Sequence, residues 1–273
     1  MLGRRCAIKL AKLISKLVYY TGAYAVLNLI FNRNGVYIVF YHRLGDRSRD
    51  HFDDSFTVDC RNFEKHAGYF KAAYEVISMD DVPGILGSGC IPAKKYMAVT
   101  FDDGYRDNFV HGHKIFQEYH LRPAVYLTAN CVDKQIYLWT DLVGRIVSLS
   151  ENTKTGHRKK LPTASLIKRL KGFSEEEKLV FIEQLKEKHC IGEVDGCSLM
   201  LDWDQVREMM EAGVVIGGHT MTHPILSRLP EGDIPYEILE SKLLIERRIN
   251  RPVRHFAYPN GKKGDYTGYA KRE

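Results

Sequence analysis

Short apolar runs alternate with helical patterns along most of this sequence, and that alternation limits the fold more than any other property. The apolar runs predict strands at residues 36–41, 74–77, 97–101, 124–128, 214–217 and 255–258. The segments between them predict helices near residues 60–73, 107–120, 174–189, 203–212 and 234–249. Ser174 and Glu177 have the spacing of a capping box at the start of the third helix. Strands that alternate with helices form parallel sheets, so we expect an α/β fold.

Polar or turn-forming residues directly follow four of the predicted strands. They are His42 after the first strand, Asp102-Asp103-Gly104 after the third, His219 after the fifth and Pro259-Asn260-Gly261 after the last. In a barrel of parallel strands the C-terminal ends meet on one face, and active sites form on that face. We therefore expect these residues to share one site.

Two pairs in this set have the chemistry of a metal site. Asp102 and Asp103 are adjacent carboxylates, which repel each other unless a cation or a proton separates their states, although Asp-Asp-Gly is also a common turn sequence. His219 and His223 are four residues apart, and on a helical turn this spacing places both imidazoles on one face. With one carboxylate they form a set that binds a metal and leaves a position open for water.

Two segments carry a family resemblance. Thr100-Phe-Asp-Asp-Gly104 and His219-Thr-Met-Thr-His223 resemble the first two motifs of the polysaccharide deacetylase family, which has a NodB-like homology domain. The wider context, residues 101–108 and 256–261, looks most like the poly-β-1,6-N-acetylglucosamine deacetylase branch. The resemblance extends from about Tyr37 to Tyr266. It implies a distorted (β/α) barrel of about seven parallel strands, either circularly permuted or truncated at its C-terminus.

The resemblance also implies roles for single residues. Asp103, His219 and His223 would bind one divalent metal, with zinc the expected ion and other divalent transition metals as alternatives. Asp102 would be the general base.

The third motif of the family, matched here by Tyr258, Pro259 and Asn260, would lie at the substrate, and the backbone N–H of Asn260 would support the oxyanion. His42 follows Tyr41 as in the early Tyr-His of that branch, so it is the candidate general acid. The alternative for His42 is a core-edge histidine bonded to a backbone carbonyl.

The chain departs from the family pattern in two places. Ala257 occupies the position of an arginine in the third motif, and the late motif with a general-acid histidine is absent before Glu273. Trp139-Thr-Asp141 could line the pocket in place of a late Trp/Asp motif.

The leading hypothesis is a metal-dependent hydrolase that removes N-acetyl groups from N-acetylglucosamine units of a glycan or lipid-linked sugar. The alternatives are a carbohydrate-binding module of the same fold that has lost turnover, and a hydrolase of a non-sugar amide.

Basic residues near the N-terminus recur at helical spacing, at positions 5, 9, 12 and 16. The apolar stretch that follows, residues 17–31, is shorter than the roughly 20 residues of a spanning helix, and no signal-peptide cleavage site is evident. We therefore predict a basic amphipathic helix in residues 1–34, of which residues 4–31 either pack on the domain or contact a membrane peripherally. Residues 35–273 would form the barrel domain, with a basic helical insertion near residues 145–190.

Charge and cysteine content bear on partners and location. The net charge of +6 comes mainly from residues 1–20 and 152–171, which contain no acidic residue. No nucleic-acid-binding motif accompanies these charges, so nucleic acid is not an expected partner. The six cysteines are scattered without a C-x-x-C pair, which favours reduced, structural cysteines. A location in the cytoplasm or at the inner face of the membrane is therefore favoured.

Overall fold

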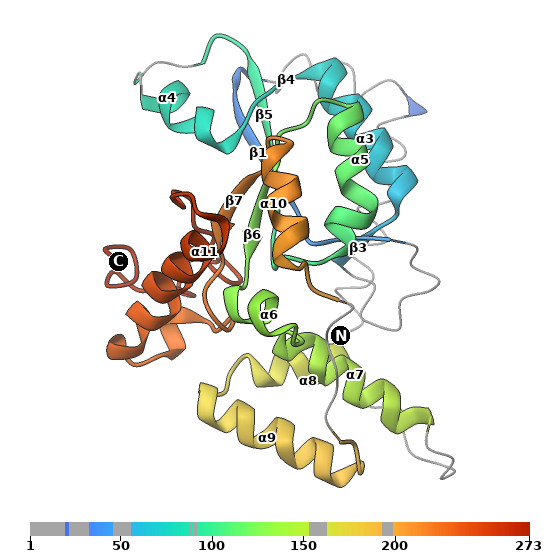
Figure 1. Ribbon diagram of the computed structural model, residues 1–273, viewed down its shortest axis with the longest axis vertical. Coiled ribbons are helices and arrows are strands. Elements are labelled where there is room, and N and C mark those ends of the chain that lie inside the picture. Colours follow the sequence, from blue (N-terminus) through green and yellow to red (C-terminus); the bar gives the residue numbers. More distant parts are fainter. Residues whose placement is uncertain are drawn as a thin grey trace.

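The computed structural model describes residues 20–21, 33–45, 56–87, 89, 92–152, 163–192 and 199–273. A parallel sheet with the strand order β1-β5-β6-β7 lies at its centre (Figure 1). These strands are β1 (Gly35–Tyr41), β5 (Lys95–Phe101), β6 (Ala124–Leu127) and β7 (Val215–Gly218). Strand β1 pairs with β5 along its whole length, while β4 (Glu75–Val76) pairs with the start of β5 and β6 with its end. A separate two-stranded sheet joins β2 (Arg43–Leu44) to β3 (Thr57–Val58).

Helices cover the sheet. In Figure 1, α3 and α5 lie together on one side of the sheet and α11 lies on the other. The α-helices around the sheet are α3 (Cys60–Ala73), α4 (Val82–Gly87), α5 (His113–Glu118), α6 (Ala129–Lys134), α10 (Trp203–Glu211) and α11 (Ser241–Ile249). Single π-helical turns, Asn108–Gly112 and Tyr236–Glu240, precede α5 and α11, and short 3₁₀ turns occupy Met79–Asp81, Leu226–Arg228 and Glu231–Asp233. The α/β class predicted from the sequence is confirmed.

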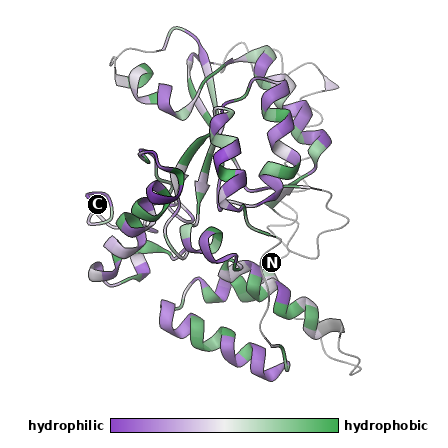
Figure 2. Cartoon of the chain, in the orientation of Figure 1, coloured by the Kyte–Doolittle hydropathy of each residue, from purple (hydrophilic) through white to green (hydrophobic). Residues whose placement is uncertain are grey.

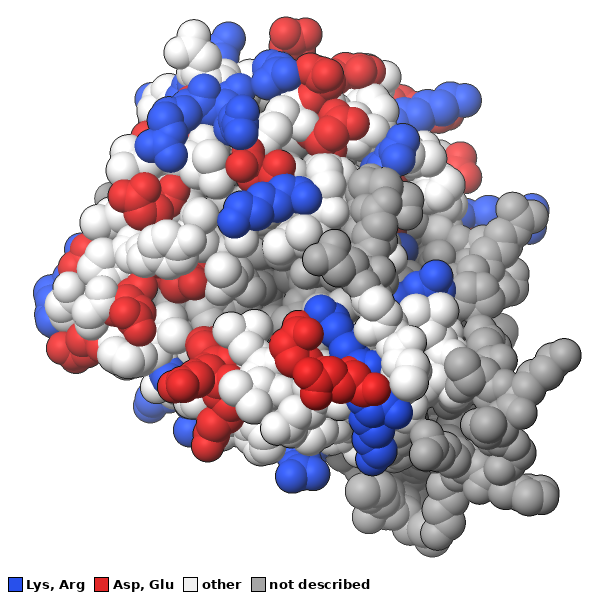
Figure 3. Space-filling model, turned by 60° about the horizontal axis from the view of Figure 1, so that its bottom comes forward, with Lys and Arg blue, Asp and Glu red and all other residues white. Residues whose placement is uncertain are grey.

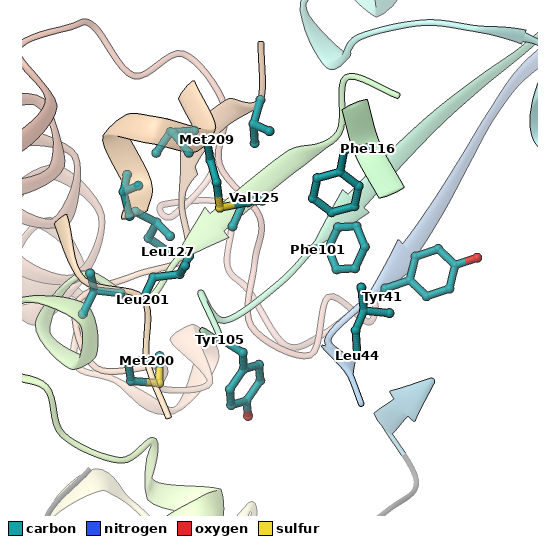
Figure 4. Packing of buried hydrophobic residues seen from close by; sticks show 14 of the residues in the cluster. Tyr41, Leu44, Phe101, Tyr105, Phe116, Val125, Leu127, Met200, Leu201 and Met209 are labelled. Carbon is teal, nitrogen blue, oxygen red and sulfur yellow. The ribbon is translucent and has the colours of Figure 1, made fainter. Parts of the chain in front are cut away.

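The main core lies between the sheet and its helices and is rich in aromatic rings. Phe63 of α3 contacts Phe101 of β5, with ring centroids 5.5 Å apart. Phe116 of α5 contacts the same ring, with centroids 5.2 Å apart (Figure 4). Helix α3 presents Phe63, Ala67 and Phe70 to this core at helical spacing. Each fully buried aromatic side chain stabilises the fold by roughly 1.5–3 kcal/mol. Figure 2 shows the strands as largely hydrophobic. The aromatic packing therefore holds the C-terminal ends of β1 and β5 in place.

The last predicted strand, residues 255–258, is not a full strand. Only Phe256 forms a parallel bridge, to Gly218, through the hydrogen bonds from Gly218 N to His255 O and from Ala257 N to Gly218 O, both 2.9 Å. The pairing ends there because Pro259 has no N–H and Asn260 turns the chain with a left-handed φ of 62°. The central sheet therefore has five strands plus this bridge, and the described residues include no further strand that would close it into a seven-stranded barrel.

A second helical group lies below the C-terminal ends of the strands in Figure 1. It consists of α7 (Trp139–Asn152), α8 (Thr163–Leu170) and α9 (Glu175–Lys188), which share a small core of their own. The predicted capping box opens α9, because Ser174 N donates to Glu177 Oε2 at 2.8 Å and Glu177 N donates to Ser174 Oγ at 3.2 Å. Figure 3 brings this side forward and shows basic and acidic side chains interspersed over the part of it that is described.

Two predictions fall mainly outside the described residues. Of residues 4–31 only Tyr20 and Thr21 are described, and part of the basic stretch, residues 153–162, lies outside the described ranges. Among the helices that are described, none has the length and apolarity needed to cross a membrane.

Candidate metal centre

Three of the predicted ligands meet at the C-terminal end of the sheet. Asp103 follows β5, His219 follows β7, and His223 lies in the loop after His219. Asp103 Oδ1 is 3.4 Å from His219 Nε2 and 3.2 Å from His223 Nε2. One ligand atom from each residue lies within 4.8 Å of the other two, and Asp103 and His219 are only 5% and 2% exposed. The structure therefore brings these residues together as the sequence predicted.

The Asp-Asp-Gly segment is a tight turn as well as a source of carboxylates. Asp103 and Gly104 both have left-handed backbone conformations, with φ of 78° and 83°. A side chain at Gly104 would meet Leu127 Cδ2 at 3.0 Å and Val132 Cγ2 at 3.2 Å, so the turn needs glycine here. A left-handed φ is uncommon for residues other than glycine, although aspartate adopts it more often than most, and such conformations cluster at functional sites. The turn thus points the Asp103 carboxylate into the site.

The two histidines share a site, but not because they lie on a helix, and the helical interpretation of their spacing was wrong. The segment after β7 is a loop in which Thr220 and His223 have φ of 68° and 63°, which a helix does not allow. Thr220 Oγ1 accepts a hydrogen bond from the His223 N–H at 2.9 Å. This side chain replaces the carbonyl that would receive that N–H in a helix.

The buried carboxylate of Glu237, which no sequence motif indicated, holds the same loop. Glu237 accepts hydrogen bonds from the N–H groups of Met221 and Thr222, both at 2.9 Å, and from Thr222 Oγ1 at 2.7 Å. Burial raises the pKa of Glu237, while the hydrogen bonds from Thr222 and Met221 oppose that rise. Glu237 thus holds the loop between the two histidines through its contacts with Met221 and Thr222.

We expect Glu237→Gln to weaken metal binding by roughly 10- to 100-fold, the usual cost of losing an outer-shell partner. The glutamine side chain offers one acceptor oxygen in place of two, so the loop would lose part of its support. A competition titration of zinc against a chelator measures the effect. Glu240, an exposed residue in the same helical turn, provides the matched control Glu240→Gln, which should bind zinc as the wild type does. Equal affinities in the two variants would contradict this role for Glu237.

Hydrogen bonds orient the His219 imidazole and hold the backbone at His223. His219 Nδ1 donates to the Ala257 carbonyl at 2.8 Å, which leaves Nε2 directed at Asp103. The carbonyl of His223 accepts a hydrogen bond from Trp139 Nε1 at 3.2 Å. Asp103 Oδ1 is buried without a hydrogen-bond partner among the described residues. A buried carboxylate oxygen that faces two imidazole nitrogens suits a divalent cation, because these are the donor atoms that zinc and similar metals prefer.

The charges of the site favour the ionised form of Asp103. Burial alone would raise the pKa of Asp103, but the neighbouring His223 and His219 hold it well below its usual range. Burial lowers the pKa of His223, and this favours the neutral imidazole that binds a metal. In His219 burial opposes the attraction of the nearby Asp103 and Asp102 carboxylates, and the net effect raises its pKa. The cluster thus holds an anionic carboxylate at its centre.

Asp102 and His42 lie at the ends of adjacent paired strands. Tyr41 pairs with Phe101, and Asp102 N donates to the Tyr41 carbonyl at 2.9 Å, so the residues that follow both strands emerge together. Burial raises the pKa of Asp102, while the nearby charges of His219 and His42 oppose that rise. The half-buried His42 ring contacts the ring of Phe56, with centroids 5.0 Å apart, and bonds to no backbone carbonyl of the described residues.

The third-motif residues lie on the turn after the Phe256 bridge. Pro259 is buried, and the Tyr258 ring stacks on Tyr266 with centroids 4.5 Å apart. Asn260 is exposed, and its side chain accepts a hydrogen bond from Lys171, which belongs to the turn after α8. Ala257 occupies the position of the expected arginine and contributes its carbonyl, to His219.

Trp139 and Asp141 lie at the start of α7, beside the site. Trp139 is buried and bonds to His223, while Asp141 accepts a hydrogen bond from the Tyr105 hydroxyl at 2.8 Å. Arg43 lies over the Tyr105 ring, 5.1 Å from its centroid, and pairs with Asp107 at 2.9 Å. Burial raises the pKa of Asp141 to about 7.

This pKa gives a pH-dependent stability that can be measured. A folded-state pKa of about 7, against an ordinary value of 3.8, means that the stability Asp141 contributes at low pH is lost as the pH rises to 7. Asp141→Asn cannot ionise and still accepts the Tyr105 hydrogen bond. In the presence of a chelator, its stability relative to wild type should therefore rise by about 2–3 kcal/mol from pH 5 to pH 8, measured by urea unfolding. An advantage that does not change with pH would contradict the raised pKa.

Comparison with known proteins extends these observations. The family model for polysaccharide deacetylase matches residues 91–273. A curated relative, the provisionally named polysaccharide deacetylase YxkH of Bacillus subtilis, is 20% identical over 231 residues. That match covers 84% of this chain but only 58% of the relative, so the chain spans little more than half of that protein's length.

Solved structures share the fold at low sequence identity. The deacetylase PplD of Streptococcus pyogenes, in complex with acetate, superposes with a TM-score of 0.57 at 17% identity, over 87% of this chain and 77% of its own. IcaB from Ammonifex degensii gives 0.56 at 16% identity, over 88% and 78%. A de-N-acetylase from Aggregatibacter actinomycetemcomitans gives 0.55 at 17% identity, over 87% and 82%.

Proposed function

Because this chain belongs to the polysaccharide deacetylase family, we propose that it hydrolyses the N-acetyl groups of N-acetylglucosamine units in a glycan or lipid-linked sugar, with one bound divalent metal ion. The observation that carries the proposal is the cluster of Asp103, His219 and His223, in which a buried carboxylate oxygen without a hydrogen-bond partner faces two imidazole nitrogens. Asp102, a second carboxylate, lies directly beside this cluster.

The residues of the site divide the work of amide hydrolysis. When a zinc or similar ion is bound by Asp103, His219 and His223, it supplies a Lewis acid and lowers the pKa of water. Asp102 accepts the proton of the attacking water, and its raised pKa suits a general base. The backbone N–H of Asn260 donates to the carbonyl oxygen as negative charge develops there.

His42 donates a proton to the nitrogen that leaves. The C–N bond then breaks without forming an amide anion, and the products are acetate and a free amine. His42 suits this role because it ends the strand beside the one that carries Asp102.

The choice of N-acetylglucosamine rests on the branch that residues 101–108 and 256–261 resemble. The fold shared with a de-N-acetylase is consistent with it. A peripheral membrane contact through residues 4–31 would suit a lipid-linked substrate, and it stays a proposal.

The competing function is binding without turnover, which Ala257 favours because the expected arginine is missing. Mass spectrometry of N-acetylglucosamine oligomers, with β-1,6 and β-1,4 linkages, separates the two functions. After incubation with zinc-loaded protein we expect successive losses of the mass of one acetyl group, and none with Asp103→Asn protein. Oligomers that bind but keep their mass would support the binding module instead.

A further inference from the structure

A lysine from the helical group α7–α9 reaches the third-motif turn. Lys171 lies in the turn after α8, and its ammonium donates to the Asn260 side chain. Its charge lies close enough to Asp103 and His223 to affect the pKa of His223. Lys171 therefore lies at the rim of the metal cluster, although none of the motifs identified in the sequence includes it.

A second lysine lies beside it. Lys262 follows Asn260 by two residues, and its charge helps to lower the pKa of Lys171, after burial, which is the larger cause. Asp265 is the nearby acidic residue, and its carboxylate accepts the Lys262 backbone N–H at 3.1 Å. Lys171 thus contacts the residue that we place at the substrate oxyanion, and the exposed Lys262 lies close enough to affect the pKa of Lys171.

The charge of Lys171 is only partly compensated. Across the described ranges, no carboxylate lies within salt-bridge distance of Lys171 or Lys262. Lys178, a buried lysine of α9, has such a partner, because its ammonium is 2.6 Å from Glu175. A half-buried ammonium without a close carboxylate has lost hydration that an incoming anion would replace.

We propose that Lys171 and Lys262 form a subsite for an anionic group on the glycan, next to the sugar that is deacetylated. The subsite rests on the proposed function, since it places the acetamide at the metal cluster. The substrate class is then an N-acetylglucosamine-containing glycan with a carboxylate or a phosphate on the neighbouring position. Because Lys171 is half-buried, its attraction for an anion is screened less than that of a lysine on an open surface, so it discriminates between charged and neutral sugars.

Three probes test the subsite: a neutral N-acetylglucosamine disaccharide, a disaccharide whose second unit is N-acetylmuramic acid, and a disaccharide 1-phosphate. Their Kd values are measured by calorimetry on zinc-loaded Asp102→Asn protein, in which turnover is suppressed. We expect the anionic probes to bind about tenfold more tightly than the neutral one at low salt. Preference for only one of them identifies carboxylate or phosphate as the natural group.

Matched lysine variants locate the effect. Lys171→Met and Lys262→Met, each in the Asp102→Asn background, should reduce the advantage of the anionic probes to less than about threefold and leave the neutral probe unchanged. Lys186→Met is the control, because Lys186 also belongs to this helical group but pairs with Glu183 at 2.7 Å. Equal binding of neutral and anionic probes, or an advantage that survives both Lys171→Met and Lys262→Met, overturns the proposal.

Acetate release by the wild type distinguishes this proposal from the function on which it rests. Release from the neutral disaccharide without any preference for charge would overturn the subsite and leave the deacetylase function standing. A lysine-dependent preference in binding without acetate release from any probe would overturn the deacetylase function and support the subsite.

Discussion

Asp103→Asn is expected to remove metal binding and acetate release together. The Asp103 carboxylate faces both imidazoles at 3.2–3.4 Å, and a neutral amide is a poor ligand for a divalent cation. The loss of zinc affinity should exceed the roughly 100-fold effect of removing an outer-shell partner. Zinc content after dialysis and the rate of acetate release measure the two effects.

Asp102→Asn provides the comparison, since Asp102 and Asp103 are neighbours with different proposed roles. Asp102→Asn should keep its zinc while turnover falls by roughly 10²–10⁴, because only proton transfer is lost. Equal loss of zinc in Asp102→Asn and Asp103→Asn would overturn the division between base and ligand.

His42→Ala is the second change with a large expected effect. An amine leaves poorly as an anion, so without its proton donor the turnover should fall by a factor on the order of 10²–10⁴. The proton is transferred in the transition state, so KM should change little and kcat should carry the effect. Steady-state kinetics with an N-acetylglucosamine oligomer separate the two constants.

His66 offers the control for His42→Ala. It is an exposed histidine of α3, and its Nδ1 is 3.0 Å from the Tyr41 hydroxyl. His66→Ala should retain turnover close to that of the wild type. Near-normal turnover in His42→Ala would mean that another residue is the acid.

Most of the fold was predictable because β1, β5, β6 and β7 are short apolar runs with polar residues at their ends. Asp102, Asp103 and His219 could be placed at one edge for the same reason, since parallel strands end together. The 255–258 strand was overpredicted, because periodicity does not show that Pro259 ends the pairing after one bridge. The local apolar pattern thus predicts where a strand lies better than it predicts how long the strand is.

The interior of the site was less predictable, because its contacts join residues that are distant in the sequence. Glu237 lies 15 residues beyond Thr222, and nothing in its local pattern distinguishes it from a surface glutamate. Lys171 ends the basic stretch of residues 152–171, where no local pattern distinguishes it from its neighbours, yet its side chain contacts Asn260, which is 89 residues away. We predicted correctly that His219 and His223 share one site, but the helical turn that we expected between them is a loop. The spacing of the two residues does not reveal the left-handed backbone at Thr220.

Metal dependence is the central claim, and a stoichiometric titration tests it most directly. Protein stripped with a chelator is supplied with increasing zinc, and acetate release from an N-acetylglucosamine oligomer is followed at each step. We expect stripped protein to release no acetate, and activity to rise linearly and reach its limit at one zinc per chain. Acetate release that is the same in stripped and zinc-loaded protein would contradict a catalytic metal at Asp103, His219 and His223.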